Sequence, residues 1–589
     1  MKTHWVPVLL LLIFVILLSG CSSDSARSQP LDSIWSRGLS VGISNLREPA
    51  AITVADQGRK AHLIWGQKGD YGTDIHYTRI DRESGVELSE NLQSGLFLPR
   101  SYRLFVTPRG QVHLLTLAKS NKDGVSGVYH LQISDNAELV SRPKLVTPPD
   151  HSVEAYGAVM LPDGQASLVW ESSRETGGGL YQRKMDWEND AIGDDIVMVN
   201  ASGKGPSLAL GETGVLHLIW YVDDGKRGVR EIFYADFPQA MVETSDGLLL
   251  TTFGRSDSAS YSRPVIGYDD SHIYVFWHSK IVAGMEAGTG KTLFLAFPKE
   301  RPQAGDLHEI LIPDLPGMIA PASNGKWYAP ISPGMALVSS SYVIYPSPIS
   351  STAPELPLLL SAKMTYRMQE AMQPMMAVLT DGVQVGYAPV ARTDHLSYFP
   401  VGVRDGMKDA YSVWLDYRGG GYYPVYLSAT SPEWKAGALR ISGRAITTDV
   451  SRELAFGLLA VVALTPMLLL ILLLPLAWIV ILLLLGRAEH LDTRNGRIEL
   501  GVAIAIFYVT KIAAFLSLFG SPSLLRTMPQ TWASVFLVVL PVSIFLIASI
   551  SLWAYVRRAD PPGLPTGFFL FAITDLTLTA LVYGPTLYT

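Results

Sequence analysis

The sequence predicts an all-β propeller followed by an α-helical bundle that crosses a membrane. Short apolar runs, most of which end in tryptophan, recur roughly every 50–57 residues between Trp65 and Trp277, and four long apolar stretches follow Ala455. A repeat of this length with several strands per unit is typical of propeller blades. An apolar stretch of about 20 residues is long enough to cross a bilayer as a helix.

The first 20 residues have the pattern of a secretory signal peptide. Lys2 precedes an apolar run from Val6 to Leu18, which is short for a membrane span. The run ends in Leu18-Ser19-Gly20-Cys21, which resembles the lipobox of bacterial lipoproteins, and Cys21 is the only cysteine in the sequence. The resemblance implies cleavage before Cys21 and a lipid (diacylglyceryl and palmitate) anchor on it; the alternative is an uncleaved signal anchor.

Residues 21–30 are small and polar, and we expect them to form a flexible tether. Ser22 follows the cysteine, a pattern that resembles an outer-membrane signal in bacteria with two membranes. A helical bundle does not belong in an outer membrane, so the combination favours a source with a single membrane.

Residues 31–447 have the alternation of strands rather than helices, with turn residues at hairpin spacing. Between Trp277 and Trp414 the spacing covers two units, and Ala336–Tyr345 is the strand expected between them. We therefore predict seven blades, with six as the alternative number and a pair of β-sandwiches as the alternative fold. The similar runs are His62–Trp65, His113–Thr116, Ser167–Trp170, His217–Trp220, Tyr274–Trp277 and Tyr411–Trp414.

The repeat also resembles bacterial propellers of the sialidase-like type. The shared pattern is apolar-apolar-Trp, a loop with Asp or Arg and glycines, and then apolar-Tyr; Trp414–Gly420 followed by Val425-Tyr426 fits it best. The Asp-box of many such repeats, Ser-x-Asp-x-Gly-x-Thr-Trp, is absent. No arginine triad or tyrosine–glutamate pair is placed, so the resemblance implies a fold and no catalytic residue.

Two matching loops carry the candidate ligand-binding residues: Asp223, Asp224 and Arg227 in one, Asp416 and Arg418 in the other. Propellers bind ligands where the blade loops converge, and paired carboxylates there would suit glycoside hydrolysis. Solvated loop charges explain the same residues without a ligand.

Three other patterns are given structural interpretations. His62, His113 and His217 recur at one repeat position, but Ser167, Tyr274 and Tyr411 fill it elsewhere, which breaks any metal-binding ring. Gly288–Thr292 lacks the glycine spacing of a phosphate-binding loop and is predicted to be a hairpin. No metal or other cofactor is therefore predicted, and the net charge of −6 gives no basic face for nucleic acid.

Residues 453–589 form the predicted membrane domain. Its first stretch contains Pro466 and Pro475, so it is either one kinked helix or a hairpin of two short helices. A single crossing puts Arg487, Arg494, Arg497, Arg557 and Arg558 in the cytoplasm and leaves Arg526 outside, as the positive-inside rule favours. The four stretches are Ala455–Leu485, Leu500–Phe519, Trp532–Tyr555 and Thr566–Tyr583, with the C-terminus outside.

Lys511 in the second stretch and Asp575 in the fourth lie deep in the predicted spans. A lone charge in lipid is costly, so we expect both to face inwards and to pair. Three roles remain open: a proton or ion relay, a contact with a partner's helix, or a salt bridge that fixes helix packing.

The architecture leads to three functional hypotheses. The first is a binding or scaffold module on the bacterial cytoplasmic membrane, lipid-anchored and multi-pass, whose extracytoplasmic propeller binds a membrane protein or an envelope polymer. The second is an envelope glycoside hydrolase of the sialidase-like type, and the third is a sensor or transport accessory subunit. All three rest on analogy of fold, because no motif identifies a substrate.

Overall fold

The computed structural model describes most of the chain, and two compact units emerge from it: a propeller unit and a helical unit. The residues described are 34–69, 72–107, 109–187, 191–211, 213–238, 243–303, 305–314, 328–331, 339–366, 369–393, 395–405, 409–440, 443–486, 490–515 and 530–584. Cys21, with the signal and tether around it, lies outside them, as do Arg487 and Arg526.

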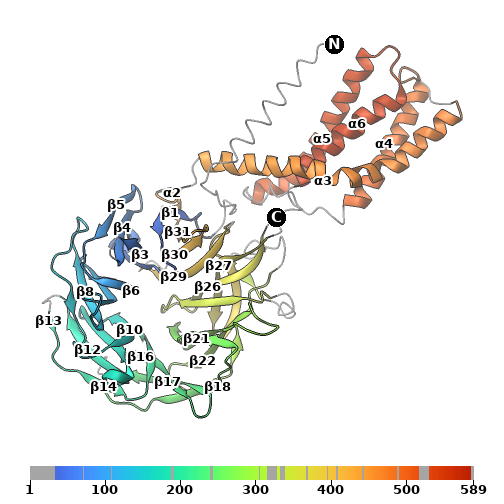
Figure 1. Cartoon of the computed structure of the whole chain (residues 1–589). Coiled ribbons are helices and arrows are strands. Elements are labelled where there is room, and N and C mark those ends of the chain that lie inside the picture. The colour runs from blue at the N-terminus through green and yellow to red at the C-terminus, as the bar shows by residue number, and fades with distance from the viewer. Residues whose placement is uncertain are drawn as a thin grey trace. The chain divides into compact units, whose positions relative to one another are not determined.

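The propeller unit contains seven antiparallel sheets that follow one another around a ring (Figure 1). This confirms the seven-bladed fold and excludes the six-bladed and sandwich alternatives. Blade I comprises β2 (Ala51–Ala55), β3 (Lys60–Gly69), β4 (Gly72–Asp81) and β5 (Gly85–Leu92). Blade II comprises β6 (Phe97–Val106), β7 (Val112–Lys119), β8 (Ser126–Ile133) and β9 (Lys144–Leu145). Blade III comprises β10 (Val153–Met160), β11 (Gln165–Ser172), β12 (Leu180–Asp186), β13 (Ala191–Ile192) and β14 (Val197–Asn200).

Blades IV to VII continue the ring with the same up-and-down order. They comprise β15 (Lys204–Leu210), β16 (Leu216–Asp224), β17 (Val229–Phe237) and β18 (Leu248–Gly254); β19 (Ala259–Tyr261), β20 (Val265–Tyr268), β21 (His272–Ile281), β22 (Gly290–Pro298) and β23 (His308–Glu309); β24 (Ala329–Pro330), β25 (Val343–Pro348), β26 (Leu356–Tyr366), β27 (Gln369–Thr380) and β28 (Val383–Pro389); and β29 (Leu396–Arg404), β30 (Ala410–Tyr417), β31 (Tyr423–Ala429) and β1 (Leu39–Ser44).

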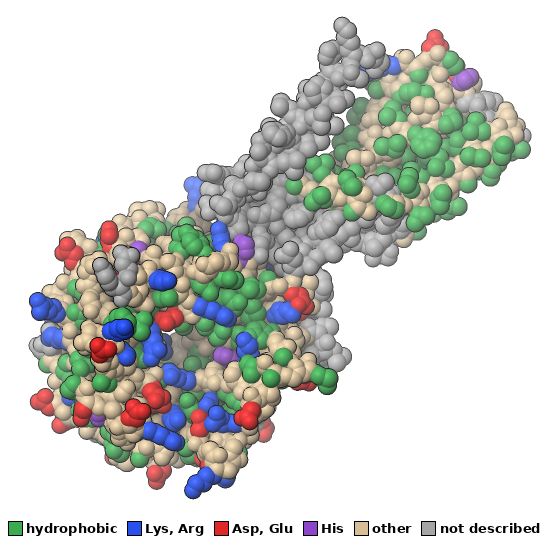
Figure 2. Space-filling model, viewed as in Figure 1, with side chains coloured by type: hydrophobic (Ala, Val, Ile, Leu, Met, Phe, Trp, Pro, Cys, Tyr) green, Lys and Arg blue, Asp and Glu red, His purple; other side chains and the backbone are tan. Residues whose placement is uncertain are grey.

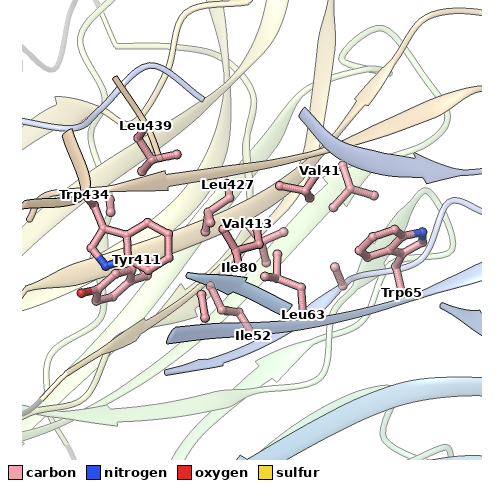
Figure 3. Close-up of a cluster of buried hydrophobic side chains, with 14 of the residues drawn as sticks. Val41, Ile52, Leu63, Trp65, Ile80, Tyr411, Val413, Leu427, Trp434 and Leu439 are labelled. Carbon is pink, nitrogen blue, oxygen red and sulfur yellow. The ribbon is translucent and has the colours of Figure 1, made fainter. Parts of the chain in front are cut away.

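The ring is closed by strands from both ends of the propeller sequence. β1 pairs with β31 as the outer strand of blade VII, so the last blade is completed by the first strand of the chain. The short helix α2 (Pro432–Ala436) adds Trp434, whose indole N–H donates to the Gly58 carbonyl at 2.6 Å. Figure 3 shows Trp434 and Tyr411 beside side chains of blade I, in the buried cluster that joins the two blades.

The repeated tryptophans form the core of the blades. Trp65, Trp170, Trp220, Trp277 and Trp414 all lie on the second strand of their blade and are fully buried. Burying a side chain of this size contributes several kcal/mol, and truncating one to alanine typically costs about 3–5 kcal/mol. Regular spacing of these residues is therefore a direct consequence of stacking one blade on the next.

Blade VI differs from the prediction. The expected strand Ala336–Tyr345 overlaps β25, but β25 is the inner strand of the blade and not the counterpart of the tryptophan strands. That counterpart is β26, whose buried face uses leucines such as Leu358 and Leu360 in place of tryptophan. Without the aromatic marker, the sequence pattern pointed to the neighbouring strand.

The helical unit contains four long helices among its described residues: α3 (Gly443–Leu484), α4 (Arg494–Phe515), α5 (Gln530–Arg558) and α6 (Leu564–Tyr583). α3 is one continuous helix of 42 residues through Pro466 and Pro475, which decides against a hairpin. Two described segments, Val538–Arg558 and Leu564–Tyr583, are long and apolar enough to cross a membrane, and α3 contains a shorter apolar segment, Leu469–Leu484.

Candidate binding site at one end of the propeller axis

The inner strands of five blades are irregular near their first residues. Register shifts interrupt β6, β10, β15, β25 and β29 where each pairs with the second strand of its blade. Such bulges bend a strand and redirect its side chains, and they are frequent next to binding sites. All inner strands start at the same end of the propeller axis. The bulges therefore redirect side chains towards that end of the axis.

Several residues in these bulges have a left-handed backbone. The φ angles are 51° at Leu98, 56° at Ser101, 61° at Tyr345 and 53° at Phe399, and none of these residues is glycine. A non-glycine residue in this region costs on the order of 1–3 kcal/mol and persists only when its surroundings enforce it. Half of the eight described non-glycine residues with positive φ lie in these bulges, and the other four lie in turns.

Two arginines connect blades that are not neighbours in the ring. Arg47, just before blade I, donates from Nη2 to the Tyr345 hydroxyl of blade VI at 3.5 Å. Arg263, just before β20 of blade V, donates to the Glu154 carbonyl of blade III at 3.2 Å. Each contact skips one blade, so these side chains reach across the inside of the ring.

The side chains that gather at this end of the propeller axis are here called the axial cluster. Figure 2 shows Lys and Arg side chains gathered around the centre of the propeller face in view. The cluster consists of Arg47, Glu48, Arg100, Glu154, Glu171, Arg263, Tyr345, Tyr398 and Phe399.

One half of the axial cluster is aromatic. The rings of Tyr345 and Phe399 lie 4.3 Å apart between centroids, and the Arg47 guanidinium lies 4.2 Å above the Tyr398 ring. His278, from the end of β21, contacts the Tyr345 ring edge-on and accepts its backbone N–H at 3.4 Å through Nδ1. Burial lowers the pKa of His278 to about 4, with Lys280 adding to the shift, so the imidazole is neutral at pH 7 and remains an acceptor.

The other half contains two neighbouring carboxyl groups. Glu171, at the end of β11, is 3% exposed and accepts the Gly205 N–H at 2.9 Å. Burial raises the pKa of Glu171. The hydrogen bond from Gly205 and the charge of Arg263 oppose this shift, whereas Glu154 adds to it. Gly205 has φ +56°, and a Cβ there would lie 2.5 Å from the Tyr221 ring, so the turn that donates to Glu171 requires glycine.

Glu48 provides a third carboxyl group with an unusual environment. Its Oε2 atom is buried, and no hydrogen-bond partner lies within reach among the residues that the structure describes. Burial raises the pKa of Glu48, and the positive charge of Arg100 opposes the shift. A buried acceptor without a donor is costly to the folded state.

The five loop residues predicted from the sequence lie at the ends of β16 and β30 and in the hairpins that follow these strands, at the same end of the propeller as the axial cluster. Asp223 forms an ion pair with Arg230 at 2.8 Å, and Arg227 pairs with Asp224 at 2.5 Å and with Glu231. Most of these charges pair within the β16–β17 hairpin, and Arg255 also lies 3.6 Å from Asp223, so a role of this loop in ligand binding stays a prediction.

Asp416 and Arg418 also have local partners. Asp416 is fully buried and accepts from the Ser397 hydroxyl at 2.6 Å and from the Trp414 indole at 3.1 Å. Arg418 donates to the Tyr426 hydroxyl at 2.5 Å. Both residues join the strands of blade VII, so any role in ligand binding stays a prediction.

The repeated histidines have structural partners. The Nδ1 atoms of His62 and His217 lie 2.7 and 2.8 Å from the hydroxyls of Tyr77 and Tyr234, each on the next strand of the same blade. His113 lies 3.0 Å from His130 in the same way. Each of these three histidines therefore contacts a side chain within its own blade. Gly288 and Thr289 lie in the turn that joins β21 and β22, as the hairpin interpretation requires.

In the helical unit, Lys511 of α4 and Asp575 of α6 form an ion pair. Asp575 is fully buried; its Oδ2 accepts from the Tyr508 hydroxyl at 2.6 Å, and Lys511 also donates to the Thr579 hydroxyl at 2.8 Å. Both carboxylate oxygens are thus used, as expected for a charge pair that holds two helices together. Their role beyond packing stays a prediction.

No group of three or more His, Cys, Asp or Glu side chains with the geometry of a metal site occurs in the described part of the chain. Arg100 and Arg263 place positive charge near Glu48 and Glu171, a combination of groups that suits polar recognition or acid–base catalysis.

A proline marks the inner strand of six blades, and this signal could have located the axial cluster. The dipeptides are Glu48-Pro49, Leu98-Pro99, Gly205-Pro206, Arg263-Pro264, Tyr345-Pro346 and Phe399-Pro400. Proline is tolerated in sheets at edge strands and bulges because it has no N–H to donate. Several of the residues that precede these prolines belong to the axial cluster.

No protein-family model matches the chain, and no curated protein is similar to it at a significant level. Solved structures with a similar fold include the polysaccharide lyase Uly1, at 13% identity and a TM-score of 0.41 over 69% of this chain and 95% of that one. The α-L-arabinanase of Penicillium chrysogenum, complexed with arabinobiose, is 11% identical with a TM-score of 0.35, over 56% of this chain and 92% of that one.

An endo-arabinase of Bacteroides thetaiotaomicron is 14% identical with a TM-score of 0.28, over 48% of this chain and 98% of that one. The likeness to these glycoside hydrolases and lyases concerns the fold alone, and no residue role is transferred from it.

Proposed function

We propose that the chain is a membrane-held extracytoplasmic binding module whose propeller binds an envelope polymer at the axial cluster. The observation that carries this proposal is the contact of Arg47 and Arg263 across non-neighbouring blades, next to strained bulges. Strain of this kind is retained where a site needs side chains in fixed positions. Aromatic rings, arginines and carboxyl groups then supply apolar, donor and acceptor contacts for a polar polymer.

Membrane attachment is the second part of the proposal. The Cys21 lipid and the helices from α3 onwards would tether the propeller at both ends of its sequence. The loops α3–α4 and α5–α6 are tied by the Leu491 N–H, which donates to the Pro562 carbonyl at 2.9 Å. Arg494, Arg497, Arg557 and Arg558 are therefore at one end of the helices, which supports a cytoplasmic location for that end.

The test uses the full chain in lipid nanodiscs and purified envelope polymers: peptidoglycan, teichoic acid and neutral polysaccharides. We expect saturable binding of at least one polymer without release of fragments. Absence of binding to all of them would overturn the polymer proposal. Cross-linking in native membranes, followed by mass spectrometry, tests the docking role, for which a stoichiometric membrane partner is expected.

An envelope glycoside hydrolase is the second candidate, and the Glu154–Glu171 pair is the observation that favours it. A buried carboxyl with a raised pKa is suited to act as a general acid, and an exposed neighbour is suited to act as base or nucleophile. Release of reducing ends from a bound polymer, abolished in Glu171→Gln, would establish this candidate over the binding module.

A further inference from the structure

We infer that Tyr345 and Phe399 form a stacking subsite for one sugar ring that carries an anionic group, with Arg47 beside them to receive the charge. The inference rests on the proposed binding of an envelope polymer and names the chemistry of the unit that is bound. It concerns the aromatic half of the axial cluster and is independent of any role of the carboxyl pair.

The backbone at both residues points to a binding role. Tyr345 and Phe399 have φ angles of 61° and 53°, although glycine or asparagine would adopt this conformation at lower cost. Both are followed by a proline in a bulged inner strand of neighbouring blades. Two large aromatic residues at two equivalent strained positions are explained if the rings themselves are needed there.

The ring arrangement leaves an apolar surface at the end of the axis. The Tyr345 and Phe399 rings are only half-buried, and their planes meet at 48° with centroids 4.3 Å apart. The exposed parts of these rings offer an apolar surface to the C–H face of a sugar. The Tyr345 hydroxyl and the exposed Arg47 guanidinium stand beside these rings and offer polar contacts to the edge of a sugar.

The charges around the rings select against a cation as the ligand. Aromatic cages bind ammonium groups through their ring faces. Here Arg47 already covers the Tyr398 ring at 4.2 Å, and Lys280 lies 5.7 Å from the centroid of the Tyr342 ring. These positive groups instead attract an anionic substituent, and arginine forms bidentate pairs with both carboxylate and phosphate groups. The shared chemistry is therefore a ring with a carboxylate or phosphate group.

The test compares Tyr345→Gly and Phe399→Gly with the wild type, as full chains in nanodiscs. Glycine accepts the left-handed φ, so the backbone is retained while the ring is removed. Asp381→Gly is the matched control, because Asp381 has φ 51° in the β27–β28 turn, at the opposite end of the propeller. The probes are polygalacturonate for carboxylate, teichoic acid for phosphate, neutral arabinan, and a tyrosine-rich acidic peptide.

We expect the wild type to bind polygalacturonate or teichoic acid, and the polymer that binds identifies the anionic group. Both ring-removing variants should bind this polymer with an affinity reduced about tenfold or further, whereas Asp381→Gly should bind it like the wild type. Thermal unfolding of each variant checks that the fold is retained.

Three results would overturn the inference. Wild-type affinity in both ring-removing variants would refute the subsite and leave the proposed function in place. Equal binding of arabinan, or binding of the peptide alone, would refute the anionic sugar. Failure of the wild type to bind any polymer would overturn the proposed function together with the inference.

Discussion

The axial cluster and the Lys511–Asp575 pair are both concentrations of charge, but they are built in opposite ways. In the helical unit the Asp575 oxygens accept from Lys511 and Tyr508, and the arrangement has no unmatched charge. In the propeller, Glu48 has a buried oxygen without a described donor, and Glu154 lies beside Glu171. A satisfied pair serves stability, whereas an unsatisfied and strained group is retained in spite of its cost, as binding sites are.

Breaking the satisfied pair should have the largest effect on stability. In Lys511→Met, Asp575 is left buried without its partner, and the free energy of unfolding should fall by about 3–5 kcal/mol. The measurement is thermal unfolding of the purified chain in detergent, together with its level in membranes. The double variant Lys511→Met/Asp575→Leu should recover most of the loss. A single variant as stable as the wild type would contradict a packing role.

Acid should weaken the propeller through its buried histidines. Burial lowers the pKa of His62 and of His217 to about 4, from about 6.5 in an unfolded chain. The unfolded state therefore binds more protons between these values, and stability present above pH 6.5 is lost as the pH falls towards 4. Each histidine accounts for about 3 kcal/mol at most.

The matched test replaces both histidines by phenylalanine, which keeps a ring but does not titrate. The difference in Tm between pH 7 and pH 4.5 should be smaller in the double variant than in the wild type. An unchanged difference would show that acid acts through other groups.

Removing the buried charge of Glu171 from the axial cluster should have a small effect of the opposite sign. The pKa of Glu171 is raised in the folded state, so the stability that its protonated form supplies is present below pH 4.5 and is lost as the pH rises through the folded pKa. Glutamine resembles the protonated form at every pH. Glu171→Gln should therefore have a slightly higher Tm than the wild type at pH 7 and an equal Tm at pH 4.

The exposed neighbour provides the control for this prediction. Glu154→Gln should change the Tm less, because the Glu154 side chain is exposed to water. A lower Tm for Glu171→Gln than for the wild type at pH 7 would show that the Glu171 carboxylate stabilises the fold.

The sequence was sufficient for the fold because five of the seven blades bury a tryptophan at a fixed place in their second strand. Five tryptophans mark that place, and the prediction was least accurate in blade VI, where leucines such as Leu358 replace the marker. The four apolar stretches likewise each fall on one helix as far as the structure describes them.

The candidate site was harder to predict. The sequence drew attention to the hairpin loops with Asp223 and Arg227, because their charges are close together in the chain. Arg47 and Tyr345, and likewise Arg263 and Glu154, are far apart in the sequence and meet only in the complete ring. The prolines of the inner strands mark their positions, but bulge geometry and contacts across the axis depend on the complete ring.

The most direct test of the account compares the axial cluster with the hairpin loop at the same end of the propeller. Binding of envelope polymers by the full chain in nanodiscs is measured for Arg47→Ala, Arg263→Ala and Arg227→Ala, which remove one arginine each. The affinity of Arg47→Ala and of Arg263→Ala for the polymer should be reduced about tenfold or further, whereas Arg227→Ala should bind with wild-type affinity. Loss of binding in Arg227→Ala alone would place the site on the hairpin loops and contradict the axial cluster.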